Sequence, residues 1–169
     1  MSLTQKKSYN IFQDWPANKS NIKARLILIA FRLAHIATIN RVLFIILIPY
    51  LIMYRVLVEW FLGTELPYKT IVGKGLAIHH GQATVINDGT IIGDNCIIRH
   101  CTTMGSKMLK DGTYSKSPVI GNNVDIGSNV CIIGPIYIGD FVKIGAGSVV
   151  IKDVPAGSVV VGNPGKIIG

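Results

Sequence analysis

The chain has 169 residues, of which 49% are hydrophobic and 15% are charged, and its formal net charge is +8. This composition is too apolar for a disordered protein, and the length suffices for one domain with a hydrophobic core and a short helical extension. Three cysteines without a CxxC spacing argue against a disulfide framework or a zinc knuckle and favour a reducing compartment. The lysines are not interleaved with aromatic residues, so nucleic acid is not an expected partner.

The first third of the chain has a helical pattern and carries most of the basic excess. Residues 1–62 hold eight Lys or Arg against two acidic residues, a net charge of +6, whereas residues 63–169 hold nine against seven. An apolar stripe with a spacing of three and four residues predicts a helix, and its members are Ile22, Leu26, Ile29, Leu33 and Ile36. We expect a helical region over residues 1–64, with a bend or restart at Pro49 and a stop at Gly63.

Within this region, Val42–Tyr54 is an uncharged run of thirteen residues, shorter than the roughly twenty that a membrane span needs. Arginines and two tryptophans accompany it, so one interpretation of residues 1–62 is peripheral contact with an anionic membrane face. The other is that these apolar helices pack against each other and against the rest of an oligomer. Because the first twenty residues are polar, no signal peptide is expected. We therefore expect a cytoplasmic protein, at the inner face of the membrane under the first interpretation.

After Gly63 the helical period gives way to a period of six residues. Aliphatic residues recur without a slip at Ile120, Ile126, Ile132, Ile138, Ile144 and Val150. Glycine follows four of these residues directly. A six-residue period fits neither a helix nor a long strand, and it predicts a solenoid of short strands joined by tight corners. We expect this solenoid to occupy residues 65–169.

The same register begins earlier and is interrupted twice. Ile92 follows Ile78 by fourteen positions where two six-residue units would use twelve, so two residues are inserted. If they bulge out locally, His100 stacks on the turn of the solenoid next to His80. Between Met104 and Ile120 the register breaks in a polar, lysine-bearing segment. This segment predicts a projecting loop over residues 105–118, which is a common position for a binding site.

Five stretches resemble a known family: "VGKGLAIHHG", "TMGSK", "PVIGNNVDIGSNVCIIG", "KIGAGSVVIKDVP" and "VVGNPGKIIG". They are similar to the hexapeptide-repeat acyltransferases, and within these to the serine acetyltransferase branch. The greatest likeness is to smaller members of colanic acid and other exopolysaccharide biosynthesis. The resemblance implies a mainly β chain that forms a left-handed parallel β-helix after the helical region. It also implies a homotrimer whose active sites lie between neighbouring subunits.

Transfer of an acetyl group from a thioester to a hydroxyl needs a base for the hydroxyl proton, and a free imidazole titrates near the working pH. The resemblance places the catalytic histidine at His80 and its carboxylate partner at Glu65, which would fix the tautomer of the imidazole. We expect Arg99 and His100 to line the acceptor cleft. For His79, packing and a hydrogen bond to substrate are both open.

The co-substrate that the resemblance implies is acetyl-CoA, with no metal ion. It places the contacts with coenzyme A on six residues of the solenoid: Gly105, Ser128, Ala146, Ile151, Lys152 and Lys166. Lys152 and Lys166 suit the phosphates as point charges. Gly105 would let the chain approach the thioester closely.

The acceptor is the point on which the chain departs from serine acetyltransferases. These enzymes bind the amino-acid carboxylate with an Arg-His pair on the projecting loop, and the corresponding residues here are Lys116 and Ser117. We therefore favour a sugar hydroxyl on an exopolysaccharide or capsule precursor, free or lipid-linked, with serine as the alternative. A different class of function is a metal-binding, carbonic-anhydrase-like protein using His79, His80 and His100, or an inactive scaffold.

Overall fold

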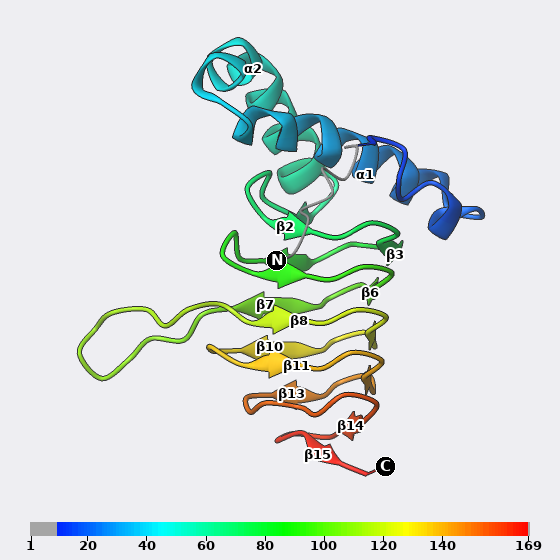
Figure 1. Ribbon diagram of the computed structural model, residues 1–169, viewed down its shortest axis with the longest axis vertical. Coiled ribbons are helices and arrows are strands. Elements are labelled where there is room, and N and C mark those ends of the chain that lie inside the picture. Colours follow the sequence, from blue (N-terminus) through cyan, green and yellow to red (C-terminus); the bar gives the residue numbers. More distant parts are fainter. Residues whose placement is uncertain (1–9, 169) are drawn as a thin grey trace, which may run out of the picture.

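The computed structural model describes residues 10–168, so the parts of the predicted helical region that fall on residues 1–9 lie outside it (Figure 1). The helical segments are η1 (Pro16–Asn18), α1 (Ile22–His35), η2 (Ile36–Thr38), α2 (Arg41–Tyr54) and the π-helix η3 (Arg55–Phe61). They form a layer at one end of the solenoid, opposite the carboxyl end of the chain (Figure 1).

Side-chain caps begin both α-helices. Asn21 accepts a hydrogen bond from the Ala24 backbone amide at 3.0 Å, and Asn40 accepts one from Leu43 at 2.9 Å, so each cap pairs an otherwise free amide of the first turn. Pro49 does not break α2, which runs on into η3. The helical region ends before Gly63, as predicted, and the φ of +63° at this residue is the left-handed conformation that glycine adopts without strain.

The face of α1 that is buried differs from the stripe that predicted the helix. Ile22 and Leu26 are 70% and 61% exposed. The buried residues are instead Ala24, Ile27, Leu28, Phe31, Arg32 and Ala34. Both sets have three- and four-residue spacings, so periodicity alone cannot choose between them. The choice is made by Arg32, whose buried side chain turns this face toward the solenoid.

The solenoid consists of short strands in three parallel sheets, and this confirms the predicted fold class. The first sheet has the order β1-β4-β7-β10-β13, the second β11-β8-β5-β2 and the third β15-β14-β12-β9-β6-β3. Among the strands of residues 10–168, only β14 and β15 pair antiparallel. The strands are β1 (Thr64–Glu65), β2 (Ile71–Val72), β3 (Ala77–His79), β4 (Thr84–Ile86), β5 (Ile91–Ile92), β6 (Ile97–Arg99), β7 (Thr103–Gly105), β8 (Val119–Ile120), β9 (Asp125–Ile126), β10 (Cys131–Ile133), β11 (Tyr137–Ile138), β12 (Lys143–Ile144), β13 (Val149–Val150), β14 (Val159–Val161) and β15 (Lys166–Ile167).

The period-six residues fill the interior of the solenoid. All six predicted residues from Ile120 to Val150 are at most 3% exposed. Successive turns lie so close that a Cβ added at Gly127 would fall 2.6 Å from the backbone nitrogen of Ala146. Glycine after the aliphatic residue is therefore required by the approach of the next turn. The segment between β7 and β8 leaves the solenoid as a long loop (Figure 1).

Side chains from the helical layer cover the open edge of the third sheet, at strand β3. The Asn18 side chain accepts a hydrogen bond from the Ile78 amide at 3.1 Å and donates one to the Leu76 carbonyl at 2.8 Å. Asn21 donates to the Ile78 carbonyl at 3.0 Å. These amides replace the strand that would otherwise pair there, which protects the edge and holds the backbone that precedes His80.

Candidate active site

His80 and His100 lie together at the corner between the third and the first sheet. His80 follows β3 and His100 follows β6, and their ring centroids are 5.7 Å apart with the planes at 83°. The inserted residues explain this placement. Ile78 pairs with Ile98, twenty positions later, whereas Val85 pairs with Thr103, only eighteen positions later. The predicted bulge of two residues is thus confirmed, and it lies directly at His80.

The backbone of the bulge is held in an unusual conformation. His80, Gly81 and Ala83 all have positive φ, at 71°, 72° and 53°. For residues with a Cβ this conformation is costly and persists only where surrounding contacts hold it. One such contact is the Thr64 hydroxyl, which donates to the Gly81 carbonyl at 2.9 Å. Five other non-glycine residues of the solenoid also have positive φ, so this conformation belongs to its tight corners and does not by itself mark a functional site: Asn95, Cys101, Asn123, Asn129 and Phe141.

The two imidazoles differ in exposure. His80 is exposed to solvent, whereas His100 is half-buried. The Nδ1 atom of His100 is buried and has no hydrogen-bond partner among the described residues. Buried polar atoms in proteins are nearly always paired, so this nitrogen is unusual, and a bound molecule could reach it only if the ring turned. The corner therefore offers one solvent-facing imidazole and one unsatisfied ring nitrogen beside it.

Glu65 lies on β1, at the start of the sheet that adjoins this corner. Its strand pairs with β4 so that Glu65 is opposite Val85, and its side chain is exposed. Within residues 10–168 no hydrogen bond joins Glu65 to His80. The negative charge of Glu65 also affects the pKa of Glu59. Burial raises the pKa of Glu59, Arg55 lowers it, and Glu65 adds a smaller increase. The catalytic pairing of Glu65 with His80 remains a prediction.

Arg99 lies beside the residues that were predicted to bind coenzyme A. His79 and Arg99 are opposite each other in the β3–β6 pair, and His79 is exposed. The Arg99 guanidinium forms an ion pair with Asp125 and donates to the Ile126 carbonyl at 3.1 Å. It thereby turns away from the helical layer, along the outer face of the third sheet.

A cavity of about 420 Å³ on this face brings three predicted residues together. Arg99, Ser128 and Ala146 line it, with Asp125 and Lys143 alongside. The remaining predicted coenzyme residues lie elsewhere along the solenoid. Ile151 and Lys152 are exposed after β13, Lys166 is exposed in β15, and Gly105 ends β7.

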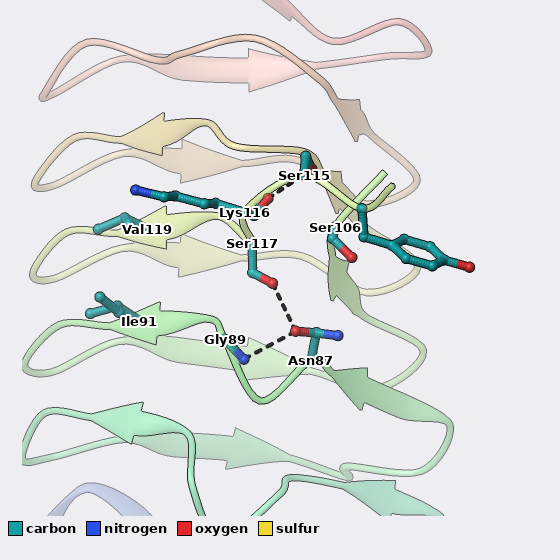
Figure 2. Close-up of a pocket in the computed structure, with 9 residues that line it drawn as sticks. Asn87, Gly89, Ile91, Ser106, Ser115, Lys116, Ser117 and Val119 are labelled. Atoms are coloured by element: carbon teal, nitrogen blue, oxygen red, sulfur yellow. Dashed lines mark hydrogen bonds between the residues drawn. The ribbon is translucent and has the colours of Figure 1, made fainter. Parts of the chain in front are cut away.

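A second cavity, of about 690 Å³, lies under the base of the projecting loop and includes Lys116 and Ser117. Figure 2 shows the Ser117 hydroxyl and the Gly89 amide converging on Asn87. Their distances to the Asn87 Oδ1 atom are 2.8 and 3.0 Å. Sequence reasoning missed Asn87, although the turn-forming segment "INDG" at residues 86–89 marks a corner where a polar side chain is exposed to a loop.

The loop and the histidines occupy different corners of the same chain. The loop leaves after β7 in the first sheet and returns at β8 in the second, whereas His80 and His100 lie where the third sheet meets the first. Lys116 is therefore separated from His80 by the width of the first sheet. No three His, Cys, Asp or Glu side chains in the described part of the chain are grouped closely enough to hold a metal ion.

Comparisons with known proteins identify the family, although no protein-family model matches the chain. It is 35% identical over 161 residues to WcaB of Escherichia coli K12, named as an acetyltransferase of colanic acid biosynthesis. That match covers 93% of this chain and 98% of WcaB. It is 34% identical over 164 residues to a serine acetyltransferase of Helicobacter pylori 26695, covering 94% of this chain and 92% of that one.

The solved structure of the soybean serine acetyltransferase apoenzyme superposes with a TM-score of 0.78 at 28% identity. It covers 92% of this chain and 66% of the soybean chain, so this chain spans about two thirds of that protein. Fold and relatives together define an acyltransferase built on a β-solenoid. The chain belongs to the family of acetyltransferases that includes WcaB and the serine acetyltransferases.

Proposed function

We propose that this protein transfers an acetyl group from acetyl-CoA to a sugar hydroxyl of an exopolysaccharide or capsule precursor. The observation that carries the proposal is the corner at which the exposed His80 ring lies edge-on to the half-buried His100 ring. Such a corner can take a proton from an alcohol and places a second imidazole beside the same molecule. The WcaB relative, which matches over nearly its whole length, is named for polysaccharide biosynthesis.

The reaction needs no covalent enzyme intermediate. His80 accepts the proton of the acceptor hydroxyl as its oxygen attacks the thioester carbonyl, and a C–O bond forms. The tetrahedral intermediate then collapses, the C–S bond breaks, and the coenzyme A thiolate takes the proton from the imidazolium. His100, half-buried beside His80, would help to orient the acceptor. Glu65 would steady the imidazolium from the neighbouring turn of the solenoid, in the manner of a triad carboxylate.

We propose that the complete site forms between two copies in a homotrimer. The loop residue Lys116 and the catalytic His80 lie at opposite edges of the first sheet. A neighbouring solenoid packed side by side would bring its own loop to the His80 corner. The cavity that holds Arg99, Ser128 and Ala146 would then take the pantetheine arm, and Lys152 and Lys166 would meet the phosphates.

The loop supports a sugar rather than an amino acid as acceptor. A free carboxylate is best held by a guanidinium with a second donor, and here the second position is Ser117, whose hydroxyl is already bonded to Asn87. This leaves Lys116 as the only cation that the two corresponding positions provide. A neutral polyol needs no such pair.

The deciding experiment is release of coenzyme A from acetyl-CoA across nucleotide sugars, lipid-linked sugars and L-serine. We expect turnover with a sugar acceptor and a loss of about 10² to 10⁴-fold in kcat/KM in His80→Ala. His35→Ala is the matched control, since His35 bonds the Tyr68 carbonyl in the helical layer. Efficient acetylation of serine with all sugars untouched would contradict the choice of acceptor. Full activity in a folded His80→Ala variant would contradict the mechanism.

A metal analysis of the purified protein distinguishes the metal-binding alternative from acetyl transfer. Stoichiometric zinc together with no thioester turnover would favour it over acetyl transfer. We also propose a cytoplasmic location, which suits the three free cysteines, Cys96, Cys101 and Cys131.

A further inference from the structure

Helix α2 exposes an apolar surface that the acetyltransfer reaction does not use. From Val42 to Tyr54 the helix has no charged residue. The large apolar side chains that α2 and η3 expose are Val42, Phe44, Ile45, Ile46, Ile48, Ile52, Met53, Val56, Leu57, Trp60 and Phe61. The helix that combines α2 and η3, Arg41–Phe61, is 21 residues long, and its most apolar stretch of 18 residues has a mean hydropathy of 2.1, so it is long and apolar enough by length and composition to cross a membrane. Only 11% of its most apolar stretch is buried.

Only one side of α2 is attached to the rest of the protein. The Tyr50 hydroxyl donates to the Ala30 carbonyl at 2.9 Å, and the Tyr54 hydroxyl donates to the Leu66 carbonyl at 2.6 Å. The positions of α2 that are buried or half-buried are Leu43, Leu47, Tyr50, Leu51 and Tyr54. With 3.6 residues per turn these five positions span about 100° of the helix, leaving about 260° in contact with solvent.

A water-exposed helix is expected to be polar on the side that faces water, and α2 is not. Between its two flanking arginines every exposed position is apolar, including Pro49. A helix that is apolar all round is stable only inside a protein core or in lipid. A second helix packed against α2 would cover a stripe of roughly 100° and would leave more than half of this surface in water. Lipid covers the whole sector at once.

Basic side chains are placed at the margin of the apolar surface. Arg41 and Arg55 flank the uncharged run. A cavity of about 580 Å³ beside the start of α2 is lined by Arg41 and Lys69 together with Phe44 and Tyr68. The Lys69 ammonium lies 5.9 Å from the Tyr68 ring centroid. This arrangement of cations around apolar side chains is complementary to anionic phosphate headgroups above acyl chains.

The geometry points to a membrane-docking surface: we propose that α2 and η3 insert into the interfacial layer of an anionic phospholipid membrane. The helix would lie in the plane of the interface and not span the bilayer. Its start is joined to α1 through η2, its end leads directly into β1, and its Tyr50 side is bonded to α1. Insertion of the exposed sector therefore leaves the solenoid and the His80 corner in water.

The test is flotation of the full-length chain with vesicles of phosphatidylcholine alone and vesicles containing phosphatidylglycerol. We expect the chain to float with the anionic vesicles, and the partition coefficient to fall at least about tenfold in Ile45→Glu/Ile52→Glu. These two residues are 57% and 61% exposed, so the substitutions do not disturb the core. Ile168→Glu, at a 66% exposed position at the far end of the solenoid, is the matched control and should float as the native chain does.

Two further measurements distinguish a lipid membrane from a second copy of the chain as the partner of this surface. In a Trp15→Phe background Trp60 is the sole tryptophan, and its 70% exposed ring should shift its emission to the blue on anionic vesicles. Arg41→Gln/Lys69→Gln should lose the preference for anionic lipid. No flotation with either vesicle would overturn the proposal, as would flotation unchanged in Ile45→Glu/Ile52→Glu. If the native chain does not float, and if Ile45→Glu/Ile52→Glu has a lower molar mass in solution than the native chain, the apolar surface is an interface with a second copy of the chain.

Discussion

Replacement of Arg32 by methionine should detach the helical layer from the solenoid. The side chains of Arg32 and Asp14 are only 2% and 3% exposed, and Nε of Arg32 lies 2.8 Å from Oδ2 of Asp14. The guanidinium also donates to the Val72 carbonyl at 2.8 Å and to the Gly73 carbonyl. Asp14 in turn accepts from the Leu76 amide at 3.0 Å. One ion pair thus ties the segment before η1, helix α1 and the first turn of the solenoid together.

The size of the effect follows from what the substitution leaves behind. Arg32→Met keeps the volume roughly constant but leaves the Asp14 carboxylate buried, with the Leu76 amide as its remaining donor among the hydrogen bonds described above. Removing one partner of a buried ion pair costs about 3–5 kcal/mol. For a chain of this length that corresponds to a fall in Tm of about 6–20 °C. The double variant Arg32→Met/Asp14→Leu removes the stranded charge as well and should recover most of the loss.

Thermal unfolding followed by circular dichroism measures the stabilities of the native chain, the single variant and the double variant. Hydrogen exchange shows which part of the protein loses stability. Amides of α1 should lose protection in Arg32→Met, whereas amides of β9 to β13 should keep it, because those turns do not contact the helical layer. Equal destabilisation of the single and the double variant would refute the reasoning. It would mean that the packing of the Arg32 side chain, and not the unpaired Asp14 charge, sets the cost.

Three further predictions concern one carboxyl group and two glycines of the solenoid. Because burial raises the pKa of Glu59, the folded state loses stability as the pH rises from the unfolded-state pKa through the folded value. The free energy of unfolding of Glu59→Gln should therefore exceed that of the native chain by up to about 1 kcal/mol at pH 7 and equal it at pH 3 to 4. Paired denaturant titrations measure this difference, and a stabilisation confined to acid pH would contradict the prediction. Gly127→Ala should cost about 1–3 kcal/mol, because its Cβ would lie 2.6 Å from the Ala146 nitrogen. Gly105→Ala, whose Cβ would meet only the Asn87 Cβ at 3.9 Å, should keep the native Tm while raising the KM for acetyl-CoA, and an unchanged KM would remove Gly105 from the coenzyme site.

The strongest predictions from sequence concerned the solenoid interior. A parallel stack of short strands places one residue of each six-residue unit inside, so the series from Ile120 to Val150 could be recognised without any tertiary information. The same arithmetic placed two extra residues between Ile78 and Ile92, and the strand pairing then located the bulge at His80. Such features depend on the spacing of residues along the chain, which can be counted in the sequence.

Contacts between distant segments could not be predicted in this way. The ion pair of Arg99 with Asp125, which directs this side chain toward Ser128, spans 26 positions. The bond between Ser117 and Asn87 spans 30. Each depends on which rotamer the surrounding turns leave open, and a repeat pattern contains no information on rotamers. The separation of Lys116 from His80 by a full sheet is likewise a property of the three-sided stack.

The sequence by itself determined that this protein is a solenoid of six-residue units carrying imidazoles at one corner. The reason is that the buried aliphatic residues recur every six positions along the chain. Tertiary structure decided which face of each helix is covered. Two sets of residues on α1 have helical spacing, and only docking through Arg32 and Asp14 selected the one that is buried. For α2 the uncharged run was visible in the chain, but its exposure around most of the helix depends on where the neighbouring elements end, and no local pattern encodes that.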